Sequence, residues 1–274
     1  MITFVPTPIG NLDDISYRTL KVLEGAEVFL CEDTRVTKQL LHLLSTRFDT
    51  TFNPKEFISV HSHNEEEFLN KLQTIDIDKN IVYLSDAGMP CISDPGAKIV
   101  DFCIKNSIKY DVLPGANAAL SAYAMSGFTS KEFLFYGFLP HKAQNRLQEL
   151  EKIFSYPFIT IIYESPKRVI TLLQEISSLD ADKTVFMVKE ISKLYQKTYK
   201  DSAKNLLKIF ENEKNIKGEW VVIIDSKEQT GNLLGFDDIK DLDIPPKQKA
   251  KLISKLKNIS VKVAYEEILG KIEE

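Results

Sequence analysis

The sequence predicts an α/β protein with two α/β domains and a small C-terminal helical extension of helix-turn-helix type. Short apolar runs alternate with amphipathic helical patterns from residue 2 to residue 224, which is typical of sheets with helices on their faces. A chain of 274 residues is long for one core, and domains of about 100–150 residues are the usual size. The apolar fraction of 43% is sufficient for two real cores.

The first half contains five apolar runs that read as strands, at 2–5, 28–31, 58–60, 81–84 and 110–113. Between them lie helical patterns: one capped by Ser16 that carries Leu20 and Leu23 on one face, and others at 37–44, 65–72 and 99–104. Because each strand but the last is followed by a helix, we expect a largely parallel sheet.

The second half repeats the alternation. Strands are expected at 133–138, 158–163, 184–188 and 220–224, and helices at 144–154, 168–176 and 203–210. The Pro114-Gly115 turn follows the last strand of the first half, so we place the domain boundary there. The predicted domains are 1–116 and 117–230, with the helical extension at 240–274.

In the extension, Pro245-Pro246 precedes one helix and Ser260 can cap a second. Between Lys247 and Lys262 there are six lysines and no acidic residue. A solvated helical face explains this run as easily as an RNA-binding surface does, so both interpretations stay open.

Bulk composition excludes several classes of protein. The net charge of −4 does not indicate a general affinity for nucleic acid, so any RNA contact has to come from a local basic patch. No targeting segment or long apolar run follows Met1, and we expect a cytoplasmic protein that makes no membrane contact. Three cysteines at unrelated spacings fit reduced thiols, and His61 and His63 have no partner cysteine or carboxylate cluster, so no metal site is expected.

Four segments that follow predicted strands break the local rules of strands and helices: 6–11, 32–35, 85–96 and 113–116. Ligands of open α/β sheets bind outside the carboxyl ends of the strands, where these segments are expected. An ordinary strand–helix turn accounts equally well for the first, and a helix cap by Asp33 or Thr34 for the second. A fifth segment, 163–168, has the same position in the second half, and there Ser165 and Pro166 also suit a helix start.

The segment 85–96 is the most informative of these. It holds two Asp, two Gly and two Pro within twelve residues after an apolar strand. Such a loop is rigid and exposes backbone amides and carbonyls, which can follow the outline of a ligand without long side chains. A plain connection does not need so many restricted positions, so we favour a binding role.

Taken together, seven segments resemble, in order, the tetrapyrrole methylase superfamily, and within it the branch that methylates ribosomal RNA of the small subunit. The segments are Pro6-Thr-Pro-Ile-Gly-Asn-Leu12, Glu32-Asp-Thr-Arg35, His61-Ser-His-Asn-Glu65, Ser85-Asp-Ala-Gly88 with Ile92-Ser-Asp-Pro-Gly96, Gly137-Phe-Leu-Pro140, Tyr163-Glu-Ser-Pro-Lys-Arg168 and Lys217-Gly-Glu219. The match covers about residues 2–225, and the extension is similar to that of the family.

The resemblance implies a homodimeric two-domain methyltransferase with S-adenosylmethionine in the interdomain cleft. It also implies the reaction, 2′-O-methylation of a cytidine in the decoding region of 16S rRNA, with the rRNA bound as part of the small ribosomal subunit. The cofactor-binding residues that it implies are Pro8, Gly10, Asp86, Ala87, Gly88, Ile92, Pro114, Gly115 and Tyr163.

The roles of charged residues are less defined. A ribose hydroxyl has to lose a proton during transfer, and the candidate bases at predicted strand ends are Glu32, Asp33, His61 and Glu164, which we leave unranked. The candidate phosphate-binding residues are Arg35, Lys142, Arg168, Lys247, Lys251 and Lys255. The chain departs from the family pattern at Met89, where Thr is usual, at Ala116-Asn117, and at Gln196, where an acid is common.

Two other functions compete with this interpretation. One is a methyltransferase of the same architecture that acts on a small molecule or a protein, and the basic extension disfavours it. The other is a non-enzymatic protein of ribosome assembly or ligand sensing with a decayed site, which the intact Asp86-Ala87-Gly88 loop disfavours.

Overall fold

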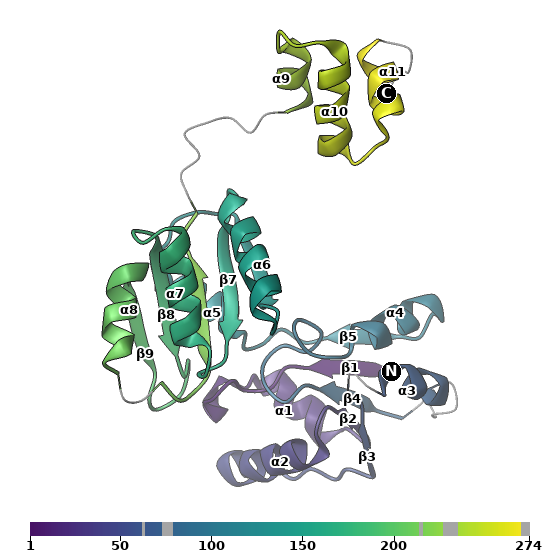
Figure 1. Cartoon of the computed structure of the whole chain (residues 1–274). Helices are drawn as coiled ribbons and strands as arrows, with labels where there is room; N and C mark the ends of the chain where they lie inside the picture. The colour runs from purple at the N-terminus through teal and green to yellow at the C-terminus, as the bar shows by residue number, and fades with distance from the viewer. Residues whose placement is uncertain (62–63, 73–78, 214–215, 227–234, 270–274) are drawn as a thin grey trace. The chain divides into compact units, whose positions relative to one another are not determined.

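The computed structural model describes residues 1–61, 64–72, 79–213, 216–226 and 235–269. The chain forms two compact units, Met1–Lys227 and Glu228–Glu274. Two five-stranded sheets and their helices make up the first unit, and a group of helices makes up the second (Figure 1). The predicted fold class is confirmed.

The first sheet is fully parallel, with the strand order β3-β2-β4-β1-β5. Its strands are β1 (Ile2–Val5), β2 (Val28–Cys31), β3 (Glu56–Ser59), β4 (Ile81–Leu84) and β5 (Tyr110–Val112). The connecting helices are the 3-10 turn η1 (Leu12–Asp14), α1 (Tyr17–Glu24), α2 (Thr34–Phe48), α3 (Glu65–Leu72) and α4 (Ala97–Lys105). As predicted, Ser16 caps α1, because its side chain accepts a hydrogen bond from the Thr19 backbone N–H.

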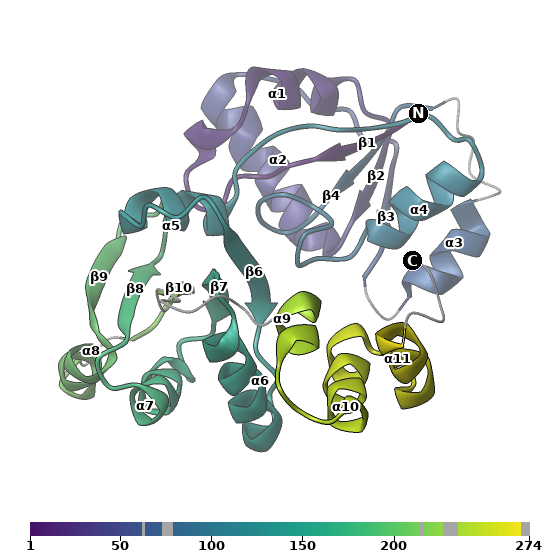
Figure 2. The ribbon, with the colours of Figure 1, turned by 90° about the horizontal axis from the view of Figure 1, so that it is seen from above.

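Both faces of this sheet are covered, and alternate residues of β4 show how. Ile81 and Tyr83 pack with residues of α3 and α4, whereas Val82 and Leu84 pack with residues of α1 and α2. Figure 2 shows these two pairs of helices on opposite faces of the sheet. Strands that are buried on both faces need apolar side chains at every position, which is why the sequence shows continuous apolar runs here.

The second sheet is mixed, with the strand order β6-β7-β10-β8-β9. Its strands are β6 (Phe133–Phe138), β7 (Ile159–Glu164), β8 (Thr184–Lys189), β9 (Lys197–Ser202) and β10 (Trp220–Ile224). The neighbours β6 and β7 pair in parallel, whereas β10 lies between β7 and β8 and pairs antiparallel with both, and β9 pairs antiparallel with β8. The alternation of strands and helices in the sequence gave no sign of this insertion.

Helices cover both faces of the second sheet as well: α6 (Ala143–Ser155), α7 (Val169–Leu179) and α8 (Ala203–Glu211) on one face, and α5 (Ala118–Ser126) on the other. Neither α5 nor β9 was predicted. The α5 sequence is apolar without helical periodicity, and β9 is a polar edge strand that pairs with β8 alone. The predicted boundary after residue 116 falls between β5 and α5 and stays a prediction, and residues 227–230 of the predicted second domain lie outside the described residues.

The second unit contains α9 (Phe236–Asp241), α10 (Pro246–Lys257) and α11 (Val261–Ile268). The predicted cap of α11 is present, since the Ser260 side chain accepts a hydrogen bond from the Val263 backbone N–H at 3.2 Å. This unit has a small hydrophobic core of its own, formed by Ile239, Ala250, Ile253 and Ala264. Across the described parts of the chain, we find no helix with the length and apolar character needed to span a membrane.

Candidate functional site

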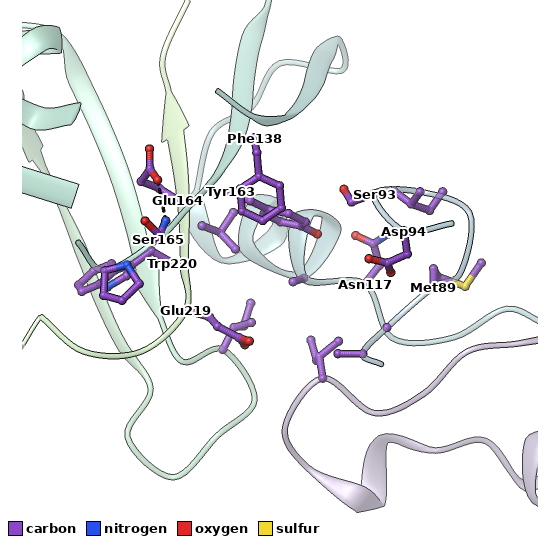
Figure 3. A pocket seen from close by; sticks show the side chains of 18 residues that line it. Met89, Ser93, Asp94, Asn117, Phe138, Tyr163, Glu164, Ser165, Glu219 and Trp220 are labelled. Carbon is purple, nitrogen blue, oxygen red and sulfur yellow. Dashed lines mark hydrogen bonds between the residues drawn. The ribbon is translucent and has the colours of Figure 1, made fainter. Parts of the chain in front are cut away.

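A cavity of about 340 Å³ lies between the two sheets of the first unit (Figure 3). One part of its wall comes from the loops after β1, β4 and β5: Ile9, Ala87, Gly88, Met89, Ile92, Ser93, Asp94, Asn117 and Ala118. The other part comes from strand ends and turns of the second sheet: Phe138, Tyr163, Glu164, Ser165, Pro166, Ile191, Glu219, Trp220 and Val221. The wall is largely apolar, and its polar groups stand at a few positions, as is typical of ligand pockets.

The loop 85–96 after β4 supplies most of the first wall, and backbone pairing holds its beginning. Thr7 and Gly88 exchange two backbone hydrogen bonds, of 3.0 and 3.1 Å. Gly88 has a φ of +82°, a left-handed conformation that a side chain would strain. A Cβ atom there would also lie 3.2 Å from Ile9 Cγ2, so the turn needs glycine.

Side chains from outside the loop hold its far end. The Tyr83 hydroxyl donates to the Pro95 carbonyl at 2.7 Å, and the Glu65 carboxylate accepts from the Gly96 backbone N–H at 2.9 Å. Gly96 has a φ of +119°, and a Cβ atom there would lie 2.8 Å from Cys91 Sγ. The loop is therefore fixed at both ends, and its middle faces the cavity.

Of the predicted cofactor residues, Ala87, Gly88, Ile92 and Tyr163 lie on the cavity wall. The others are not among the lining residues: Pro8, Gly10, Asp86, Pro114 and Gly115. Gly115 and Gly10 allow close packing there, because a Cβ atom would come within 2.3 Å of Pro6 Cγ at Gly115 and of Lys193 Cγ at Gly10. The structure therefore brings these segments together, and the cofactor roles of individual residues stay predictions.

The four candidate bases have different surroundings. Glu164 lines the cavity and is 2% exposed, but its Oε1 atom accepts hydrogen bonds from Ser165 N and Arg168 Nε at 2.6 and 2.7 Å. Asp33 caps α2, and its hydrogen bonds to Arg35 lower its pKa to about 2. Burial, followed by the nearby Asp86 carboxylate, raises the pKa of Glu32, which lies outside the cavity lining.

His61, the fourth candidate, is half-buried and is not part of the cavity wall. Its backbone N–H donates to Asn64 Oδ1 at 2.8 Å. His63, which the sequence analysis paired with it, lies outside the described residues.

The predicted phosphate-binding residues belong to both units of the chain. Arg35 and Arg168 are ion-paired with Asp33 and Glu164, and Lys142 is exposed at the start of α6. Lys247, Lys251 and Lys255 are exposed on α10 of the second unit, and their spacing of four residues places them on one helix face.

Sequence reasoning missed several residues of the cavity wall: Asp94, Asn117, Phe138, Glu219 and Trp220. Asp94 and Glu219 belong to segments that the sequence had singled out, but no local pattern indicated which side chains of those segments line the cavity. The Phe138 and Tyr163 rings pack edge-to-face at 5.5 Å and form one wall of the cavity. Asn117 caps α5, a helix that was itself unpredicted.

The family model of Tetrapyrrole (Corrin/Porphyrin) Methylases matches residues 1–207. A relative from Campylobacter fetus subsp. fetus, called ribosomal RNA small subunit methyltransferase I, is 49% identical over 98% of this chain and 100% of its own length. The chain belongs to this branch of the tetrapyrrole methylase family. The relative of the same description from Helicobacter pylori strain J99 is 41% identical over 97% of this chain and 96% of its own.

Two solved structures share the fold at low sequence identity. Diphthine synthase is 18% identical, with a TM-score of 0.62 over 82% of this chain and 90% of its own. Uroporphyrin-III C-methyltransferase from Thermus thermophilus, complexed with S-adenyl homocysteine, is 15% identical, with a TM-score of 0.55 over 83% and 97%. The resemblance of the seven segments to this family is confirmed.

Proposed function

We propose that this protein transfers a methyl group from S-adenosylmethionine to the 2′-hydroxyl of a cytidine in the decoding region of 16S rRNA. The observation that carries the proposal is the match along almost the whole chain to relatives described as ribosomal RNA small subunit methyltransferase I. Methyl transfer to small-subunit rRNA follows from membership of this branch, and the cytidine and its 2′-oxygen are the finer part of the proposal.

The cavity suits S-adenosylmethionine in shape and chemistry. The Ala87-Gly88 backbone reaches the wall without bulky side chains, and the apolar surface of Ile92, Phe138 and Tyr163 suits an adenosyl group. The bound donor supplies an electrophilic methyl group on a sulfonium centre. The chain's own residues hold that centre and the acceptor in line, and positioning of this kind can supply up to about 7–11 kcal/mol of a reaction barrier.

Two surfaces are proposed to take the RNA. The α10 face with Lys247, Lys251 and Lys255 is exposed and carries no acidic residue between Lys247 and Lys262, which suits phosphate groups. In the first unit, Lys142 is exposed next to the β6–α6 turn. Homodimer formation, cytoplasmic location and binding to the assembled subunit stay predictions from the resemblance.

The proposal is tested with small ribosomal subunits from a strain that lacks this protein, incubated with the protein and tritiated S-adenosylmethionine. We expect label in 16S rRNA at a single 2′-O-methylcytidine, located by nuclease mapping. Label in another rRNA nucleotide would overturn the assignment of the cytidine 2′-hydroxyl as the methyl acceptor. Label only in protein or small molecules would favour a methyltransferase with another substrate, and failure to bind the donor at millimolar concentration would favour a non-enzymatic role.

A further inference from the structure

Three carboxylate side chains lie on the cavity wall, and two of them are held by cations. Glu164 is paired with Arg168, and Glu219 Oε2 accepts a hydrogen bond from Lys193 Nζ at 2.8 Å. The third, Asp94, makes no ion pair with any residue in the described ranges of the chain. Asp94 is thus the carboxylate of this wall whose charge is not already balanced by a neighbouring cation.

Asp94 is also held in place. It precedes Pro95 and Gly96, whose backbone groups are bound by Tyr83 and Glu65, at 2.7 and 2.9 Å. Figure 3 shows its side chain on the wall that faces Tyr163, with Met89 and Asn117 beside it. A group of this kind can meet an acceptor in a defined orientation, because its supporting residues are themselves packed and hydrogen-bonded.

The surroundings of Asp94 strengthen it as a base. Burial raises the pKa of its carboxyl group, a hydrogen bond from the Ser85 side chain opposes that rise, and the Asp86 carboxylate adds to it. Among the described residues, the other titratable groups that interact with Asp94 are neutral or negative: Glu32 after β2, Tyr83 in β4, Cys91 in the same loop and Tyr163 in β7. A carboxylate with a raised pKa takes up a proton more readily than a free one.

We propose that Asp94 is the general base that removes the proton from the ribose hydroxyl during methyl transfer. The hydroxyl proton passes to a carboxylate oxygen of Asp94, the hydroxyl oxygen bonds to the methyl carbon, and the electron pair of the broken carbon–sulfur bond stays on sulfur. Asp94 then returns the proton to solvent. This inference rests on the proposed function and selects a residue outside the four candidate bases of the sequence analysis.

The variant that tests the role is Asp94→Asn, which keeps the size and the acceptor oxygen of the side chain but removes the basic group. We expect kcat to fall at least about 100-fold, as is usual for loss of a general base. The calorimetric affinity for S-adenosylhomocysteine should stay within about twofold of wild type. The acidic limb of the wild-type pH–rate profile should be absent from the residual activity of the variant. Asp101→Asn, an exposed acid on α4 paired with Lys105, is the matched control and should keep wild-type kinetics.

Thermal unfolding gives a readout that does not depend on activity. Since the pKa of Asp94 is raised in the folded protein, the folded state binds this proton more tightly than the unfolded chain does. Ionisation of Asp94, as the pH rises above the pKa that this group has in the unfolded chain, therefore destabilises the folded state. Asp94→Asn should have an equal or higher Tm than wild type at pH 7, and any difference should shrink below pH 4. A purely structural Asp94 predicts a lower Tm for the variant.

The outcomes separate this inference from the proposed function. If wild type labels 16S rRNA while Asp94→Asn keeps its kcat and acidic limb, the role of Asp94 is refuted and the proposed function stands. The role of Asp94 as the base is also refuted if Asp94→Asn loses affinity for S-adenosylhomocysteine. It is likewise refuted if Glu32→Gln abolishes the acidic limb while Asp94→Asn retains it. If wild type labels no rRNA, the proposed function itself fails.

Discussion

The Glu65 carboxylate accepts a hydrogen bond from the Gly96 backbone N–H at 2.9 Å, and so joins the start of α3 to the residue that precedes α4. Glu65 is only 6% exposed, which is unusual for an acidic side chain. The contact terminates the loop that forms one wall of the cavity. The conformation of this loop therefore depends on a side chain that lies 31 residues earlier in the sequence.

Replacing Glu65 with Ala should loosen this loop. The buried Gly96 N–H would lose its acceptor, so we expect the free energy of unfolding in urea to fall by about 1–3 kcal/mol. S-adenosylhomocysteine should also bind more weakly by calorimetry. Glu65→Gln keeps an acceptor oxygen and should recover most of both losses. A Glu65→Ala variant as stable as wild type would contradict the supporting role of this hydrogen bond.

Replacing Gly88 with Val should abolish cofactor binding while the protein still folds. The left-handed backbone at φ +82° disfavours a β-branched residue, and its Cβ atom would press on Ile9 across the Thr7–Gly88 pairing. Calorimetry with S-adenosylhomocysteine measures the loss, and circular dichroism checks the fold. Gly25→Ala is the control, since no atom outside its chain neighbours would come closer than 3.8 Å to the new Cβ. Unchanged affinity in Gly88→Val would mean that the cofactor lies elsewhere.

The Arg146–Glu175 pair should be important for stability of the second α/β half. Arg146 of α6 donates hydrogen bonds to both carboxylate oxygens of Glu175 in α7, and the two side chains are 6% and 17% exposed. Arg146→Met leaves a largely buried carboxylate without its cation, and we expect a loss of about 3–5 kcal/mol in urea unfolding. The double variant Arg146→Met/Glu175→Met should regain most of that loss. If the double variant loses as much stability as Arg146→Met and Glu175→Met together, the pair is not coupled as the structure indicates.

The lysines of α10 should determine the salt dependence of RNA binding. Replacing Lys247, Lys251 and Lys255 with Ala removes three charges from one exposed face. If each contacts a phosphate, the slope of log K against log salt concentration should become shallower by about 2–3. Filter binding of 16S rRNA fragments at several salt concentrations, from low to moderate, measures this slope. A triple variant at Lys105, Lys109 and Lys131, exposed lysines of the first unit, should keep the wild-type slope.

The sequence was most informative where structure follows from local pattern. Buried strands such as β2 and β4 stand out as apolar runs because both of their faces are covered, and their bounds were predicted to the residue. Ser16 and Ser260 were identified as caps because a hydroxyl before an apolar-periodic stretch satisfies the free N–H groups of a helix. The loop 85–96 stood out because Asp, Gly and Pro at this density restrict a backbone.

Contacts between segments that are distant in the chain could not be predicted from sequence patterns. The placement of β10 between β7 and β8, and the pairing of the polar strand β9 with β8, are contacts between segments that are distant in the sequence or that lack an apolar pattern. The helix α5 lacks periodicity because its small residues pack against the sheet without an apolar stripe. Local propensity carries no information about these choices.

By itself, the sequence determined the α/β class, the strands of the first sheet, the irregular loop 85–96 after β4 and the family to which the chain belongs. Only the tertiary structure decided which carboxylates meet cations and which face the cavity, because ion pairing and burial arise between residues that are distant in the chain. Asp94 and Glu164 both follow or end buried strands in segments rich in turn residues, yet only Glu164 meets an arginine. That difference in surroundings separates a carboxylate held by an ion pair from one that remains able to accept a proton.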